Sequence, residues 1–156
     1  MLYDFELAGR RVRLWQRTGE SYEHVLMKAL GYAMFIGEFP AMEIERRVGL
    51  RYKPDLVARA DRAEFALPFA FWGECGQTAV RKTAWLLKHA GVARLVLFKF
   101  DGHPAALLKE LRVSIDERYR APERLVIINF VSDITERTRE RRIARVPGGW
   151  YTRTVV

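Results

Sequence analysis

Two acidic residues, set in sequence that otherwise predicts β-strands, constrain this chain more than any other feature. Asp55 follows Lys53 and Pro54 and opens one apolar run, and Glu74 comes near the end of a longer run over 65–75. Pro54 has no amide donor and suits the first residue of a strand or an edge position. If the two runs pair as antiparallel strands, the two carboxylates converge. They then either point to solvent or hold a hard divalent cation, which prefers oxygen ligands.

Composition sets the broad class of the protein. With 156 residues, 49% hydrophobic and 29% charged, the chain is typical of a soluble globular protein, and we expect one domain over 1–156. No apolar stretch is long enough to cross a membrane, and charged residues interrupt the N-terminus, which argues against a signal peptide. The single Cys75 excludes an intrachain disulfide and a thiolate metal cluster, so we expect a cytoplasmic protein. The net charge of +8 favours polyanionic partners, nucleic acid above all.

The order of the predicted elements indicates an α/β fold. Hydrophobic periodicity predicts an N-terminal strand pair over 2–17, a helix over 21–37 capped by Thr18 or Ser21, and a polar-faced strand over 42–50. That strand, the Asp55 strand (55–60) and the Glu74 strand form a three-stranded antiparallel unit, with a turn at 60–63. A second helix, capped by Thr78 and ended by Gly91, leads to buried strands over 93–100 and 124–131, with a helix over 104–111 between them.

Charged residues near these elements leave alternatives open. Glu23, in the first turn of the first helix, is either favoured there by the helix dipole or reaches inward, and His24 beside it is expected at the surface. Arg81 and Lys82 occupy the unfavourable first turn of the second helix, and they either extend into solvent or offset an acid such as Glu74.

The last segment of the chain is basic. Beyond residue 132 the arginines include Arg139, Arg141 and Arg142, a run that belongs either to a solvated surface or to a nucleic-acid contact. Residues 150–156 follow a Pro-Gly-Gly turn and are expected to form a terminal hairpin or a mobile arm.

Three short motifs in this order resemble the PD-(D/E)xK phosphodiesterase superfamily, and within it the YaeQ-like proteins. They are Glu-Ser-Tyr-Glu at 20–23, Lys-Pro-Asp-Leu at 53–56 and Glu-Cys-Gly-Gln at 74–77. The resemblance covers nearly the whole chain. It implies a restriction-endonuclease-like core, in which a mixed sheet of three antiparallel strands plus parallel crossover strands is flanked by helices, with an extra N-terminal strand pair.

The resemblance also implies roles for individual residues. Asp55 and Glu74 would coordinate Mg²⁺ or Mn²⁺, Glu23 would supplement the metal site, and Cys75 would contribute its backbone carbonyl. The metal would activate a water that attacks phosphorus, and a cation would stabilise the transition state.

The sequence departs from the superfamily pattern at the residue that usually supplies this positive charge. The position two residues beyond the acid is usually Lys, and here it is Gly76, followed by Gln77, which can orient water. Lys82, or failing it Arg81, is expected to supply the missing charge.

These observations predict a Mg²⁺- or Mn²⁺-dependent nuclease that acts on DNA or RNA. Its site residues would be Asp55, Glu74, Gln77 and Lys82, and Lys53, Arg81 and the C-terminal arginines would bind nucleic acid. The missing lysine motivates an alternative, a nucleic-acid-binding or adaptor protein without turnover. A third alternative is a homo-oligomeric scaffold in which Trp72, Trp85 and Trp150 serve packing.

Overall fold

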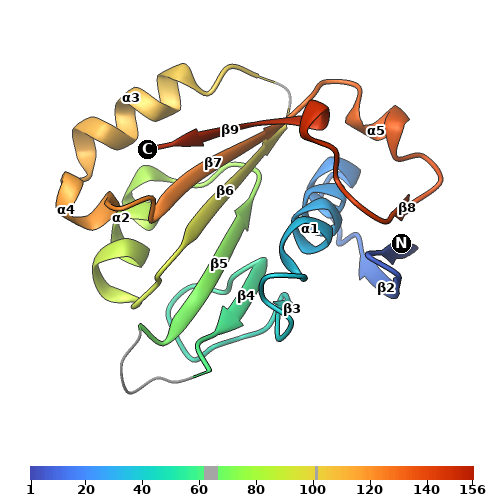
Figure 1. Cartoon of the computed structure of the whole chain (residues 1–156), viewed down its shortest axis with the longest axis horizontal. Coiled ribbons are helices and arrows are strands. Elements are labelled where there is room, and N and C mark those ends of the chain that lie inside the picture. The colour runs from blue at the N-terminus through green and yellow to red at the C-terminus, as the bar shows by residue number, and fades with distance from the viewer. Residues whose placement is uncertain (62–66, 101) are drawn as a thin grey trace.

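The computed structural model describes residues 1–61, 67–100 and 102–156, and these residues form an α/β fold with two sheets (Figure 1). A six-stranded sheet has the order β3-β4-β5-β6-β7-β9, and a three-stranded sheet has the order β2-β1-β8. The strands are β1 (Leu2–Leu7), β2 (Arg10–Trp15), β3 (Glu43–Ile44), β4 (Leu56–Arg59), β5 (Phe69–Cys75), β6 (Leu95–Phe100), β7 (Leu125–Phe130), β8 (Arg142–Ile143) and β9 (Tyr151–Val155). The helices are α1 (Tyr22–Phe35), α2 (Val80–His89), α3 (Ala105–Ser114), α4 (Glu117–Arg120), α5 (Ile134–Arg137) and the 3-10 helix η1 (Gly148–Trp150).

The six-stranded sheet is mixed, as the sequence predicts. Strands β3, β4 and β5 pair antiparallel, whereas β5, β6 and β7 pair parallel. Helix α2 connects β5 to β6 and completes the predicted strand-helix-strand crossover. Strands β6 and β7 are almost entirely buried because both faces of the sheet are covered, which explains their continuous apolar sequence.

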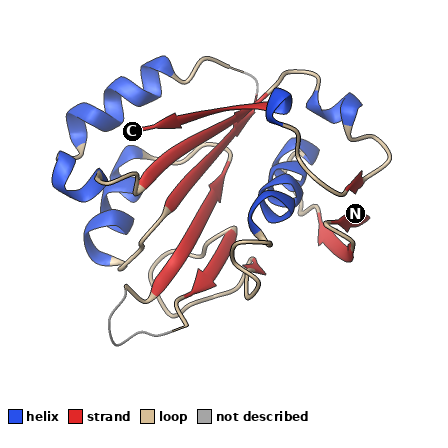
Figure 2. Ribbon diagram, in the orientation of Figure 1, coloured by secondary structure: helices blue, strands red, loops and turns tan. Residues whose placement is uncertain are grey.

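Helices cover the two faces of this sheet and define two apolar layers. Helix α1 lies on one side, and α2, α3 and α4 lie on the other (Figures 1 and 2). Phe71 and Phe98 belong to the α1 layer, whereas Trp72 and Leu97 belong to the α2 layer. Because successive strand residues alternate between faces, Glu74 lies on the same face of β5 as Trp72, toward α2.

The first 37 residues confirm the predicted strand pair and helix. Strands β1 and β2 pair antiparallel, from Leu2 opposite Trp15 to Leu7 opposite Arg10. Ser21 is the N-cap of α1, and its hydroxyl accepts a hydrogen bond from the His24 amide at 3.2 Å. None of the helices that the structure describes is long and apolar enough to cross a membrane.

Some predicted boundaries are wrong. The N-cap of α2 is Ala79, without a side-chain cap bond, and not Thr78, although Gly91 follows the helix with φ +71° as expected. The strand predicted over 42–50 contains only β3. The turn predicted at 60–63 and the start of the Glu74 strand extend into residues 62–66, outside the described residues.

The C-terminal segment forms neither a hairpin nor a mobile arm. Strand β9 pairs antiparallel with β7 and closes the edge of the large sheet, and β8 pairs parallel with β1. Both pairings satisfy backbone groups that β7 and β1 would otherwise leave open along an edge.

Candidate functional site

Asp55 and Glu74 lie beside each other where β4 begins and β5 ends. The antiparallel register places Leu56 opposite Gly73, so the residue before β4 is next to the residue after Gly73. The Asp55 amide donates to the Gly73 carbonyl at 3.1 Å, which continues the pairing by one residue. The structure therefore places the two acidic residues opposite each other on paired strands.

The carboxylate of Asp55 is held in its charged form. Its Oδ2 accepts a hydrogen bond from the Cys75 amide at 2.7 Å, and its Oδ1 lies 3.4 Å from His24 Nε2. Burial raises the pKa of Asp55, but the His24 and Cys75 hydrogen bonds outweigh burial, and the pKa is lowered.

The carboxylate of Glu74 has different partners on the α2 side of the sheet. Its Oε1 accepts from Trp72 Nε1 at 2.8 Å, and its Oε2 forms an ion pair with Lys82 Nζ at 2.8 Å. Burial raises the pKa of Glu74, and the charge of Asp55 raises it further against the opposing effect of Lys82 and Trp72. The ion pair agrees with the prediction that Lys82, at the start of α2, offsets an acid.

A second charged cluster connects Asp55 to α1. His24 Nε2 lies 3.4 Å from Glu20 Oε1 as well as from Asp55 Oδ1. Lys28 is fully buried, and its Nζ contacts Glu20 Oε1 at 2.5 Å and Glu45 Oε1 at 3.1 Å. Burial lowers the pKa of Lys28, but the two glutamates outweigh burial and the pKa is raised.

Sequence reasoning missed this cluster. His24 is not an ordinary surface residue, because its ring contacts Asp55 and its side chain is only 27% exposed. The missed signal is the spacing of His24 and Lys28, one helical turn apart on one side of α1, with Glu20 just before the N-cap residue Ser21.

Lys99 is another residue that sequence reasoning did not single out. It lies in β6, and its ammonium donates a hydrogen bond to the Gly76 carbonyl, just beyond β5. Burial lowers the pKa of Lys99, and the acidic groups of Cys75 and Glu74 oppose this effect only in part.

Other predicted site residues are not brought to the acid pair. Glu23 is half-buried in the first turn of α1, and within the described residues it makes no hydrogen bond or ion pair with Asp55 or Glu74. Its position is the one that the helix dipole favours. Gln77 and Arg81 are exposed, and Lys53 is half-buried just before Asp55.

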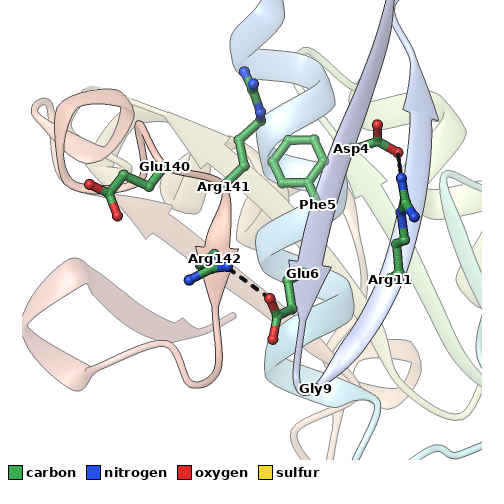
Figure 3. Close-up of a pocket in the computed structure, with 8 residues that line it drawn as sticks. All are labelled: Asp4, Phe5, Glu6, Gly9, Arg11, Glu140, Arg141 and Arg142. Atoms are coloured by element: carbon green, nitrogen blue, oxygen red, sulfur yellow. Dashed lines mark ion pairs between the residues drawn. The ribbon is translucent and has the colours of Figure 1, made fainter.

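The C-terminal arginines lie in a different part of the fold. Arg139 pairs with Glu136 at 3.2 Å, and Arg142 pairs with Glu6 at 3.5 Å. Arg141 and Arg142 line a hollow of about 320 Å³ beside β1 and β8, whose lining includes neither Asp55 nor Glu74 (Figure 3). Three acidic residues line the same hollow, so it is not a simple basic patch.

The described residues contain no group of three or more His, Cys, Asp and Glu side chains that could hold a metal ion. Any cation bound at the acid pair would therefore depend on the two carboxylates, backbone oxygen and water.

Comparisons with known proteins give a likeness in fold. No family model and no curated protein match the chain. The YaeQ protein from Xanthomonas axonopodis pv. citri superposes with a TM-score of 0.60 at 18% identity, covering 87% of this chain and 75% of that one. The YaeQ protein from Pseudomonas syringae superposes with a TM-score of 0.58 at 18% identity, covering 86% of this chain and 74% of that one. The chain therefore has the fold of these YaeQ proteins.

Proposed function

We propose that this protein is a YaeQ-like member of the PD-(D/E)xK phosphodiesterase superfamily that hydrolyses phosphodiester bonds of DNA or RNA with Mg²⁺ or Mn²⁺. The observation that carries the proposal is that Asp55 and Glu74 are opposite each other where β4 begins and β5 ends, close enough for the charge of Asp55 to raise the pKa of Glu74. The likeness in fold to two YaeQ proteins supports it. In this proposal the mixed six-stranded sheet is a restriction-endonuclease-like core.

The oxygen atoms available at the strand ends are of the type that binds a hard divalent cation. Magnesium takes oxygen ligands and is commonly held by one or two carboxylates together with waters and substrate phosphate. Asp55 and Glu74 supply two carboxylates, and Cys75, whose amide binds Asp55, adds a backbone carbonyl at the same strand end. The raised pKa of Glu74, due to burial and then to the charge of Asp55, is the kind of penalty that a bound cation offsets.

In this proposal Asp55 and Glu74 would hold the metal, which would supply Lewis-acid chemistry by polarising a phosphoryl oxygen and lowering the pKa of an attacking water. The chain's own residues prepare the site. The Cys75 amide and His24 keep Asp55 ionised, and the Trp72 indole fixes the orientation of the Glu74 carboxylate. Lys82 remains beside Glu74 and balances negative charge there.

The test is cleavage of a mixed set of single- and double-stranded DNA and RNA with Mg²⁺ or Mn²⁺ and with a chelator. Asp55→Asn and Glu74→Gln keep side-chain size and remove the negative charge, so each should abolish cleavage in a folded protein. Lys109→Gln, an exposed substitution on α3, is the matched control and should cleave as the wild type does. Cleavage that survives both acid substitutions would overturn the proposal.

A second function, nucleic-acid binding without turnover, is favoured by one observation. Each carboxylate already has donors of its own, Lys82 and Trp72 for Glu74, and His24 and the Cys75 amide for Asp55. In that case binding weakens with added salt, Glu74→Gln binds as the wild type does, and no metal supports cleavage.

A further inference from the structure

Gly76, just beyond β5, has a backbone conformation that disfavours any side chain at this position. Its φ is +81°, a conformation that residues with a Cβ rarely adopt. A Cβ built there would lie 3.0 Å from His24 Nδ1, so a side chain would also press against the imidazole. A lysine at this position would therefore be strained on this backbone.

Strand β6 brings a lysine to Gly76. The parallel register pairs Glu74 with Leu97 and Cys75 with Phe98, and the Gly76 amide donates to the Phe98 carbonyl at 3.1 Å. The next residue of β6, Lys99, is therefore beside Gly76, and its ammonium reaches the Gly76 carbonyl.

Lys99 and Glu74 lie on one face of the sheet. Leu97 belongs to the α2 layer, and Lys99, two residues further along the strand, shares its face. A Cβ at Gly76, in contrast, would point toward His24 and Met27 of α1, because the positive φ just beyond β5 breaks the alternation of the strand. Lys99 thus reaches the end of β5 from the face of the sheet on which Glu74 lies.

The partners of Lys99 and Lys82 differ. Lys82 is paired with Glu74 and lies 5.1 Å from the centre of the Tyr52 ring, so its charge is already compensated. Within the described part of the chain, Lys99 forms no ion pair, and its hydrogen-bond partner is a neutral carbonyl. An ammonium has three donors, of which that carbonyl takes one.

From this arrangement we infer that Lys99 contacts a phosphoryl oxygen of the nucleic acid at the acid pair and is the cation that stabilises charge there, with Lys82 as the counter-ion of Glu74. The inference rests on the proposed function in its substrate class, a nucleic-acid phosphodiester. It assigns the stabilising role to Lys99 in place of Lys82.

The experiment compares wild type, Lys99→Gln, Lys99→Arg and the control Lys109→Gln. Glutamine keeps a donor for the Gly76 carbonyl and removes the charge, whereas arginine keeps the charge. Binding of a fluorescent oligonucleotide, single-stranded and duplex, is measured by anisotropy with a chelator over a range of salt. Cleavage with Mn²⁺ is measured on the same oligonucleotides, and thermal unfolding confirms that each variant is folded.

Lys99→Gln should bind more weakly and lower the slope of log K against log salt by about 0.7 to 0.9, the value for one lost phosphate contact. It should also reduce kcat by about 10² to 10³, the usual effect of removing one oxyanion donor. Lys99→Arg should recover most of both properties, and Lys109→Gln should change neither.

The possible failures are distinguishable. If no variant cleaves but Lys99→Gln lowers affinity and slope, the hydrolysis proposal fails and the phosphate contact stands. If Lys99→Gln keeps the affinity, slope and kcat of the wild type, the inference is overturned while hydrolysis stands. Wild type that does not bind, or equal losses in Lys99→Gln and Lys99→Arg, would also overturn it, because the charge at position 99 would then have no role.

Discussion

The buried ammonium of Lys28 should be a major contributor to the stability of this fold. Lys28→Met keeps most of the apolar stem and removes the charge, so it isolates the two contacts with Glu20 and Glu45. Removing one partner of a buried ion pair typically costs about 3 to 5 kcal/mol. The carboxylates left behind keep 12% and 23% side-chain exposure, so water reaches them, and we expect the lower value of about 2 to 3 kcal/mol.

The pH dependence has a definite sign. The pKa of Glu20 is lowered because the hydrogen bonds from Lys28 and Arg17 outweigh the effect of burial, so its stabilising contribution is present above 4.5, the ordinary value. That contribution is lost as pH falls through the lowered folded pKa. The cost of Lys28→Met should therefore be largest at neutral pH and shrink in acid. The pKa of Lys28 is raised, so the stabilising contribution of Lys28 is complete below pH 10.5, its ordinary value. That contribution is lost as pH rises through the folded pKa of Lys28.

Urea unfolding, followed by tryptophan fluorescence at neutral pH and at a pH below the Glu20 transition, measures these costs. The double variant Glu20→Gln with Lys28→Met should be less destabilised than the two single variants predict by addition, because it removes both members of one pair. Arg139→Met, which breaks an exposed pair, is the control and should change stability little. A loss below about 1 kcal/mol in Lys28→Met, or a loss that is the same at both pH values, would refute this reasoning.

Four further predictions concern the site. Asp55→Asn should cost about 1.5 to 3 kcal/mol at neutral pH in urea unfolding, because it weakens charged hydrogen bonds, and the cost should shrink as pH falls through the lowered pKa of Asp55; an equal cost in acid would contradict this. Glu74→Gln should stay within about 1 kcal/mol of the wild type in the same assay, since the raised pKa means that the folded state disfavours the charged form, and a larger loss would contradict it. Gly76→Ala should cost about 1 to 3 kcal/mol through strain at positive φ, and adding His24→Ala should reduce that cost. Thermal unfolding of the single and the double variant measures both costs, and equal costs would contradict the reasoning. The Cys75 thiol is buried and its pKa is raised well above the ordinary value by burial, so a thiol reagent should modify it only in denaturant; rapid labelling of the folded protein would contradict its position.

Much of the fold could be predicted because its signals are local. Alternating or continuous apolar residues predict β1, β2, β5, β6 and β7, and the helical spacing of apolar residues predicts α1 and α2. The convergence of Asp55 and Glu74 also follows from sequence, since two apolar runs joined by a short connection favour antiparallel pairing.

The remaining features depend on contacts between distant segments. Strand β9 is weakly apolar and forms only because β7 offers it an open edge. The buried Lys28 pairs with Glu45, the residue directly after β3, so the helix sequence alone shows only a lysine beside apolar residues. Lys99 could be connected to Gly76 only after the parallel register of β5 and β6 was known.

That register also has a consequence for how such proteins can diverge. Position 76, just beyond β5, lies beside position 99 on β6, so two residues far apart in the sequence can each present a functional group near the same strand end. A relative with lysine at the first position, an extended backbone there and a small residue at the second could supply a similar charge near the same strand end. A comparison of such relatives should therefore consider the residues at the two positions together. If position 76 were compared alone, a lysine that had moved to position 99 would look like a lost lysine.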